Sequence, residues 1–133
     1  MSEPSRKRIL IVDDNQDILQ VISWRIQSWG YEALIAGSGE EGLRIAEDKL
    51  PDLILLDIMM PNMKGRDVCA HLKTHPKTQH IPVIFLTALS LADHVKAGMD
   101  LGADDYILKP FQPAELKERL AVCLARHSRS STK

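Results

Sequence analysis

Three aspartates follow two apolar segments of the chain, and their positions indicate a shared site. Asp57 comes directly after the continuous apolar segment 53–56, and Asp13 and Asp14 directly follow a second apolar segment, 9–12. Short continuous apolar segments are typical of strands in a parallel sheet that is covered on both faces. In open α/β sheets, ligands bind at the carboxyl ends of the strands. If the two strands are neighbours, the three carboxylates converge at that edge.

Converging carboxylates repel one another, and a divalent cation relieves the repulsion. An all-oxygen set of ligands favours magnesium. Thr87, after the apolar segment 82–86, and Lys109, after 106–108, are expected at the same edge of the sheet. A metal, a hydroxyl and an ammonium group can together surround the oxygens of a transferring phosphoryl group. Asp57 is then placed to act as the nucleophile and form an aspartyl-phosphate.

Apolar and amphipathic segments alternate along the chain. Strands are predicted at 9–12, 32–36, 53–56, 82–86 and 106–108, and helices at 15–29, 40–49, 65–74, 91–101 and 113–126. Ser38 and Glu41 have the spacing of a capping box at the start of the second helix, and Gly30 follows the first helix as a C-terminal cap. Five βα units with short loops predict an α/β fold, a doubly wound parallel sheet of five strands with helices on both faces. The glycine-rich phosphate loops of nucleotide-binding folds are absent from the sequence.

Length and composition bound the classes of protein. The 133 residues fit one domain, and a formal net charge of −1 argues against a general nucleic-acid or membrane surface. We expect a disordered N-terminus at 1–7, one domain at 8–127, and a polar tail or truncated linker at 128–133. Cys69 and Cys123 lie in amphipathic helical segments, and we expect both to be reduced, buried thiols of a cytoplasmic protein.

Four motifs occur in a characteristic order and spacing. They are Ile-Leu-Ile-Val-Asp-Asp at 9–14, Leu-Ile-Leu-Leu-Asp-Ile-Met-Met-Pro at 53–61, Phe-Leu-Thr-Ala at 85–88, and Gly-Ala-Asp-Asp-Tyr-Ile-Leu-Lys-Pro-Phe at 102–111. With these motifs, nearly the whole chain resembles the receiver domain of two-component response regulators. The resemblance implies a flavodoxin-like sheet with strand order 2-1-3-4-5 and five helices.

The resemblance also implies a role for each acid. Asp57 would be the phosphoacceptor. Mg²⁺ would be bound by Asp14, by Asp57 and by the backbone carbonyl of Met59, and Asp13 would reach the metal through a water molecule.

Further residues of the expected site lie on the last two strands. The resemblance implies that Thr87 and Lys109 hold the phosphoryl oxygens. It implies that Tyr106 is the switch aromatic, which turns inward when Thr87 moves. The peptide bond before Pro110 is expected to be cis, which sets the direction of Lys109.

The function implied is that of a phosphorylation-activated switch in a two-component phosphorelay. A phosphohistidine on a sensor histidine kinase or a histidine phosphotransfer protein would supply the phosphoryl group, and the domain would catalyse only its own phosphorylation and slow dephosphorylation. The phosphotransfer partner is expected near the first helix. A homodimer through the fourth helix, fifth strand and fifth helix is a further expectation. No direct nucleic-acid or membrane partner is expected.

Two other classes of function compete with the switch. A magnesium-dependent phosphohydrolase with an aspartyl nucleophile often has a second aspartate two residues later, where this chain has Met59. A pseudo-receiver that only binds proteins would be favoured by the loss of an acid or of Lys109, and none is lost. Apolar side chains at Met59 and Leu89 predict slow loss of phosphate, because neither can orient a water for in-line attack.

Three other features allow two interpretations each. His71 and His75 have a spacing that can hold zinc, although solvated surface histidines explain them better. Trp24 lies on the polar face of the first helix, as a partner contact or as an ordinary exposed aromatic. Lys64 stands where an acid is common in the family, which alters the loop surface and leaves the chemistry intact.

Overall fold

A five-stranded parallel sheet with helices on both faces forms the domain. The structure is a computed structural model that describes residues 6–58, 60, 63–87 and 103–131. The elements are β1 (Arg8–Val12), α1 (Gln16–Ser28), β2 (Glu32–Ala36), α2 (Gly39–Lys49), β3 (Leu53–Leu56), α3 (Gly65–Thr74), β4 (Val83–Thr87), β5 (Asp105–Leu108) and α5 (Pro113–Ser131). The strand order is β2-β1-β3-β4-β5, which confirms the predicted fold class. The helix predicted at 91–101 lies outside the described residues.

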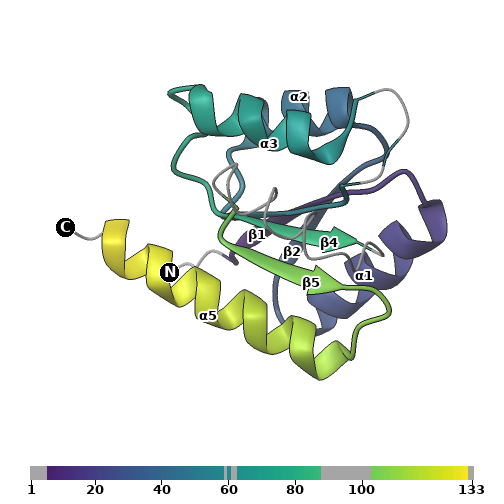
Figure 1. The fold of residues 1–133 in the computed structure, drawn as a ribbon. Coiled ribbons are helices and arrows are strands. Elements are labelled where there is room, and N and C mark those ends of the chain that lie inside the picture. The colour runs from purple at the N-terminus through teal and green to yellow at the C-terminus, as the bar shows by residue number, and fades with distance from the viewer. Residues whose placement is uncertain (1–5, 59, 61–62, 88–102, 132–133) are drawn as a thin grey trace.

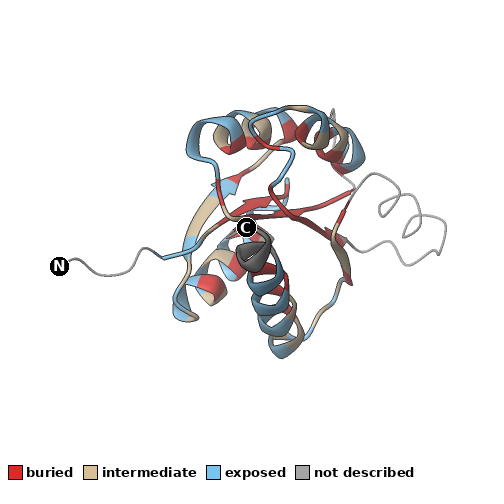
Figure 2. Ribbon diagram, turned by 90° about the vertical axis from the view of Figure 1, so that its left-hand side faces the viewer, coloured by how far each residue is buried: buried red, intermediate tan, exposed pale blue. Residues whose placement is uncertain are grey.

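The two layers of helices enclose the sheet. In Figure 1, α2 and α3 cover one face, and α1 and α5 cover the other. The central strands β1 and β3 are buried between these layers, the edge strands β2 and β5 are partly exposed, and the outer sides of the helices are exposed (Figure 2). Such burial on both faces explains why the strands read as continuous apolar segments rather than as alternating ones.

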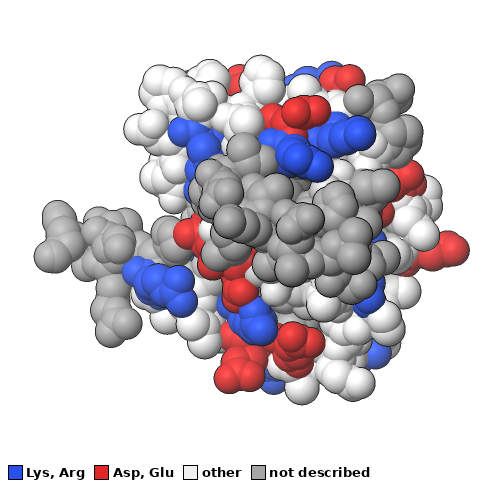
Figure 3. All heavy atoms as spheres, in the orientation of Figure 1, with Lys and Arg blue, Asp and Glu red and all other residues white. Residues whose placement is uncertain are grey.

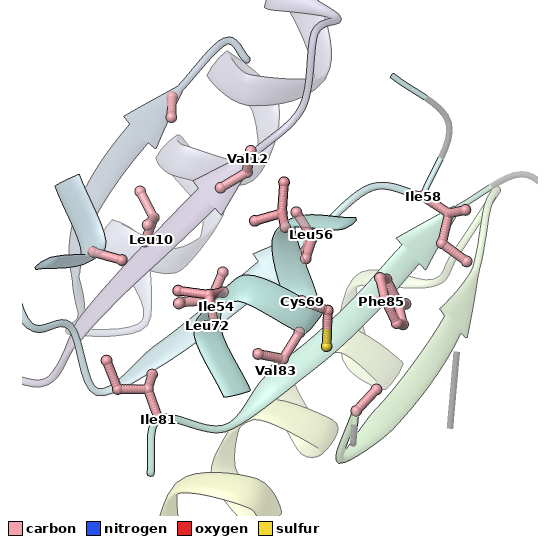
Figure 4. Packing of buried hydrophobic residues seen from close by; sticks show 14 of the residues in the cluster. Leu10, Val12, Ile54, Leu56, Ile58, Cys69, Leu72, Ile81, Val83 and Phe85 are labelled. Atoms are coloured by element: carbon pink, nitrogen blue, oxygen red, sulfur yellow. The ribbon is translucent and has the colours of Figure 1, made fainter. Parts of the chain in front are cut away.

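Alternate residues of each strand enter two separate cores. We call them the α2–α3 core and the α1–α5 core, after the helices that cover them. Leu10 and Val12 of β1 enter the first, and Ile9 and Ile11 enter the second. Figure 4 shows side chains of β1, β3 and β4 in the α2–α3 core together with those of α3. Burying each such aliphatic side chain stabilises the fold by about 1.5–3 kcal/mol, so the strand ends that carry the polar residues are held firmly.

Most element boundaries lie within one residue of the prediction. Asn15 is the N-cap of α1 rather than its first residue, and its side chain accepts hydrogen bonds from the backbone N–H groups of Asp17 and Ile18. Gly30, just beyond α1, has a φ of 97°, a conformation that favours glycine. The predicted end of the last helix near Arg126 is wrong, because α5 continues to Ser131. No glycine or proline interrupts that stretch, and a helix that has begun extends at little cost.

The start of α2 differs from the predicted capping box in one contact. The Ser38 hydroxyl accepts from the backbone N–H of Glu41 at 3.2 Å, as expected. The Glu41 carboxylate, however, accepts from the N–H of Gly37 at 2.9 Å, whereas a standard box places it on the N–H of the N-cap residue. The side chain of Glu41 therefore fixes the chain one residue earlier than predicted.

Both cysteines are buried thiols, as predicted. Burial raises the pKa of the Cys69 thiol to about 11, with the Asp104 charge adding to the effect and Lys73 opposing it. Burial likewise raises the pKa of Cys123 to about 11. Neither is a reactive thiolate at neutral pH.

The outer surface carries both signs of charge. On the face shown in Figure 3, the described basic and acidic side chains are interspersed. Among the residues that the structure describes, no helix is both long enough and apolar enough to cross a bilayer.

Candidate functional site

Asp13, Asp57 and Lys109 meet at the carboxyl edge of the sheet. Val12 of β1 pairs with Leu56 of β3, so the two acids that follow these residues emerge side by side. The Lys109 Nζ lies 2.9 Å from the Asp13 Oδ2 and 3.5 Å from the Asp57 Oδ2. One ammonium group thus bridges two carboxylates that follow two different strands.

This cluster is largely withdrawn from water. The side chains of Asp13, Asp57 and Lys109 are only 3%, 8% and 15% exposed. Ion pairs at such burial are screened far less than those on the surface, and breaking one leaves an uncompensated buried charge. Each of the three charges therefore depends on its partners in the cluster for stabilisation.

Backbone contacts hold the two buried acids in place. The N–H of Asp57 donates to the carbonyl of Val12 at 3.0 Å, and the N–H of Asp13 donates to the carbonyl of Ala36 at 3.1 Å. The Asp13 carboxylate also accepts from the N–H of Asn15 at 2.9 Å. The same Asn15 caps α1, so the helix start and the acid are positioned by one residue.

Asp14 completes an acidic group at the solvent side. Carboxylate oxygens of Asp13, Asp14 and Asp57 all lie within 4.8 Å of one another, and Asp14 is exposed. Hard oxygen ligands with one side open to water fit Mg²⁺, which retains several of its waters. The structure thus brings together the three acids that the sequence pointed to. Met59, whose backbone carbonyl is the further metal ligand that the resemblance implies, lies outside the described residues.

Gly65 is a site residue that the sequence analysis did not identify. A Cβ at this first residue of α3 would lie 2.0 Å from the Asp57 backbone oxygen and 2.7 Å from the Ile58 Cα. The N–H of Gly65 donates to the carbonyl of Ile58 at 2.9 Å. Only glycine lets α3 begin this close to the backbone of Asp57. The feature of the sequence that could have indicated this role is a glycine at the start of a helix. The preceding residue, Lys64, makes no side-chain hydrogen bond that caps the helix.

Thr87 and Tyr106 lie on the last two strands. Thr87 is the final residue of β4 and pairs with Leu108 of β5, which places its backbone at the carboxyl edge beside Lys109. Its side chain is not among the described parts of the structure, and Leu89 lies outside the described residues. Tyr106 packs partly buried against the α2–α3 core. Burial, and to a lesser degree the charge of Asp57, raises the pKa of its hydroxyl. The Lys109–Pro110 peptide bond is cis, as expected.

The family model described as the response regulator receiver domain matches residues 9–121. The chain belongs to this family. A probable transcriptional regulator, ycf27, of Cyanophora paradoxa is 44% identical over 125 residues, which are 93% of this chain and 51% of that protein. The alkaline phosphatase synthesis transcriptional regulatory protein PhoP of Bacillus subtilis (strain 168) is 39% identical over 90% of this chain and 49% of its own length. The receiver domain described here spans about half the length of these relatives.

Solved structures agree with this assignment. A CheY-like response regulator receiver domain protein from Methanospirillum hungatei JF-1 superimposes with a TM-score of 0.88, at 33% identity, over 95% of this chain and 99% of that one. A response regulator from Chloroflexus aurantiacus J-10-fl gives a TM-score of 0.87, at 36% identity, over 91% and 99%. The acidic edge described above is therefore the edge of a receiver domain of two-component signalling.

The other candidate metal residues of this receiver domain do not assemble. His71 is exposed, and His75 lies 3.9 Å from Glu47 and accepts a hydrogen bond from the N–H of Lys77. Within the described ranges, the group of side chains close enough to share a metal is the acidic one at 13, 14 and 57.

An apolar pocket lies between α1 and the segment that follows β5. It is lined by Asp17, Ile18, Val21 and Ile22 of α1 and by Phe111, which follows β5. On α1 the Trp24 side chain is 70% exposed, as its place on the polar face of the helix predicted.

Proposed function

We propose that this domain is a phosphorylation switch in which Asp57 accepts a phosphoryl group from a phosphohistidine of a partner protein. The observation that carries the proposal is the contact of Lys109 with both Asp13 and Asp57, 2.9 and 3.5 Å from their carboxylates. A carboxylate held beside a buried cation, with further acids to attract a divalent metal, is arranged for phosphoryl transfer rather than for structural support alone.

The chain's own groups account for the transfer. An Asp57 oxygen attacks phosphorus, and the new O–P bond forms as the P–N bond to histidine breaks. The phosphohistidine ring carries a proton on its other nitrogen, so the imidazole leaves as the neutral base. Lys109 is placed to bind a phosphoryl oxygen and to balance the charge that the transfer brings to the edge. Asp13 and Asp14, with Asp57, would hold Mg²⁺, which when bound supplies positive charge to the phosphoryl oxygens. Thr87, at the end of β4, would donate its hydroxyl to the same group.

Tyr106 is the proposed reporter of the phosphorylated state. It lies on β5, which pairs with the strand that ends at Thr87, and its pKa responds to the charge of Asp57. Movement of Thr87 toward a phosphoryl group would open space for this ring. The surface of β5 and α5 would then change, and with it the proposed homodimer contact.

The proposed partner is a sensor histidine kinase or a histidine phosphotransfer protein that docks on α1. The apolar pocket formed by Ile18, Val21 and Phe111 lies on the same side as the acidic edge, because α1 follows the loop that carries Asp13 and Asp14. A partner helix whose apolar side chains enter this pocket would bring its histidine toward Asp57.

The test is incubation with acetyl phosphate and Mg²⁺, followed by intact mass spectrometry and peptide mapping. The wild-type domain should gain one phosphate, and Asp57→Asn should gain none, because the nearly isosteric amide is not a carboxylate nucleophile. Asp67→Asn is the matched control, since Asp67 is an exposed acid in the first turn of α3. Phosphate on Asp13 or Asp14 in the wild type would contradict the assignment.

The same experiment separates the two competing functions. Rapid, repeated turnover of external phosphoesters would indicate a phosphohydrolase. No mass change in the wild type, together with normal folding, would indicate a pseudo-receiver. The intact set of acids and Lys109 favours the switch over both.

A further inference from the structure

We propose that Glu41 is a positioning residue for the acidic edge and acts on Asp13 through the peptide unit between Ala36 and Gly37. The inference rests on the proposed function, because it assigns to Glu41 a part in preparing the metal-binding and phosphoryl-accepting edge. Glu41 lies in the first turn of α2 and belongs neither to the acidic group nor to the contacts of Lys109.

The two hydrogen bonds that carry the inference meet on one peptide bond. The N–H of Gly37 donates to the Glu41 Oε1 at 2.9 Å. The carbonyl of Ala36 accepts from the N–H of Asp13 at 3.1 Å. Because this carbonyl and this N–H belong to the same planar peptide unit, Glu41 fixes the orientation of the group that holds the backbone of Asp13.

The hydrogen bond that Glu41 accepts, rather than its charge at a distance, also acts along this path. A carboxylate that accepts from an amide N–H forms a short, strong bond, and hydrogen bonds in series polarise one another. The Ala36 carbonyl is therefore both oriented and strengthened as an acceptor for Asp13. Asp13 in turn contacts the Lys109 Nζ at 2.9 Å, so the path ends at the proposed phosphoryl-binding cation.

The surroundings leave this peptide little freedom. A Cβ on Gly37 would come within 3.1 Å of the Gln16 Nε2 and 3.9 Å of the Glu41 Oε1. The side chain of Gln16, at the start of α1, thus lies close to Gly37, together with the Glu41 carboxylate that binds its N–H. Ser38 caps Glu41 itself at 3.2 Å, which keeps the carboxylate close to Gly37.

The experiment compares three substitutions of Glu41 with a control in the same turn. Glu41→Ala removes the acceptor, Glu41→Gln keeps an oxygen at the same reach, and Glu41→Asp keeps the charge but is one methylene shorter. Glu40→Ala is the control, because Glu40 is exposed and also lies in the first turn of α2. Each protein is first shown to be folded by circular dichroism. Mg²⁺ affinity is then measured by calorimetry, and amide exchange of Asp13 is measured by NMR without metal.

The proposal predicts that the effect of each substitution depends on whether the side chain at position 41 can still accept the hydrogen bond from the N–H of Gly37. Glu41→Ala and Glu41→Asp should weaken Mg²⁺ binding about three- to tenfold, equivalent to about 0.7–1.4 kcal/mol, and should speed exchange of the Asp13 amide. Glu41→Gln and Glu40→Ala should stay within about twofold of wild type, a range of about 0.4 kcal/mol. If Glu41→Ala does not fold, the Gln and Asp variants still decide the question.

Two results would overturn the proposal. If Glu41→Gln weakens binding while Glu41→Asp does not, Glu41 acts as a distant charge and not through Gly37. If Glu41→Ala lowers the melting temperature but leaves Mg²⁺ affinity and Asp13 exchange unchanged, its role is confined to α2. Absence of Mg²⁺ binding in the wild type would instead count against the proposed metal site, and the metal-free exchange of Asp13 would still test Glu41.

Discussion

Replacing Lys109 by methionine should move stability and metal affinity in opposite directions. Methionine keeps most of the apolar length of the lysine stem and removes the ammonium group that lies 2.9 Å from Asp13 and 3.5 Å from Asp57. With the three acids ionised, the net charge of the four side chains falls from −2 to −3. The variant therefore isolates the electrostatic part of the site.

The expected loss of stability follows from burial. Removing one partner of a buried ion pair costs about 3–5 kcal/mol, and we expect about 3 kcal/mol here because Asp14 leaves one side open to water. A domain with about 5–15 kcal/mol of total stability remains folded after this loss. Two unit charges about 4 Å apart interact by about 1 kcal/mol even at the dielectric constant of water. Loss of the repelling ammonium should therefore tighten Mg²⁺ binding about fivefold or more.

The assay combines urea unfolding with and without Mg²⁺, calorimetric titration of Mg²⁺, and phosphorylation by acetyl phosphate. Lys109→Met should be less stable than wild type without metal and should gain more stability from Mg²⁺. Its rate of phosphorylation should fall roughly 100-fold, as for removal of one preorganised donor. Lys117→Met, at an exposed position of α5, is the control. Weaker Mg²⁺ binding in Lys109→Met, or metal-free stability equal to that of wild type, would refute the charge argument.

Four further predictions follow from the same structure. Gly65→Ala should destabilise the domain by about 1–3 kcal/mol, because the new Cβ meets backbone 2.0 Å away. Gly39→Ala is the control and should cost less, because its new Cβ meets the side chains of Val68 and Met63 instead. Equal urea midpoints for the two variants would contradict this explanation. Asp14→Asn should weaken Mg²⁺ binding and raise metal-free stability, because it removes one of three repelling charges. Calorimetric melting without metal tests this, and a variant less stable than wild type would disprove it. The thiols of Cys69 and Cys123, with pKa values of about 11, should resist iodoacetamide at pH 8 in the folded protein and react after unfolding, as mass spectrometry can show. The pKa values of the two thiols in the folded protein lie above the ordinary value near 8.5. The contribution of the thiols to stability is therefore complete below about pH 8.5 and declines toward pH 11. A urea midpoint that rises over this pH range would be inconsistent with burial as the cause.

The rule that ligands bind at the carboxyl ends of parallel strands explains why the sequence alone indicated the site. Asp13, Asp57 and Lys109 each follow a buried strand, and parallel strands end at one edge, so their meeting could be predicted without coordinates. The fold class followed from the alternation of buried strands and amphipathic helices. The order of the strands came from the family resemblance, since the alternation alone does not specify which strands are neighbours.

Contacts between backbone groups were beyond the reach of pattern analysis. The spacing of Ser38 and Glu41 predicted a local cap, but it did not show that the carboxylate would bind Gly37, because that choice depends on how β2 ends beside Asp13. Gly65 looked like an ordinary helix start until the distance to the Asp57 backbone was known. The length of α5 was underestimated because polar composition was taken as a stop signal, although composition alone does not end a helix.

The place of the two tryptophans gives the domain a built-in optical probe. Both lie at α1, where the Trp24 side chain is 70% exposed and Trp29 packs partly buried against the α1–α5 core. Fluorescence emission shifts to shorter wavelength when an indole leaves water, so a protein that covers the outer surface of α1 would shift the Trp24 signal and leave that of Trp29 as a constant background. Docking can therefore be followed without a label, and Trp24→Phe provides the spectrum in which only the partly buried indole emits.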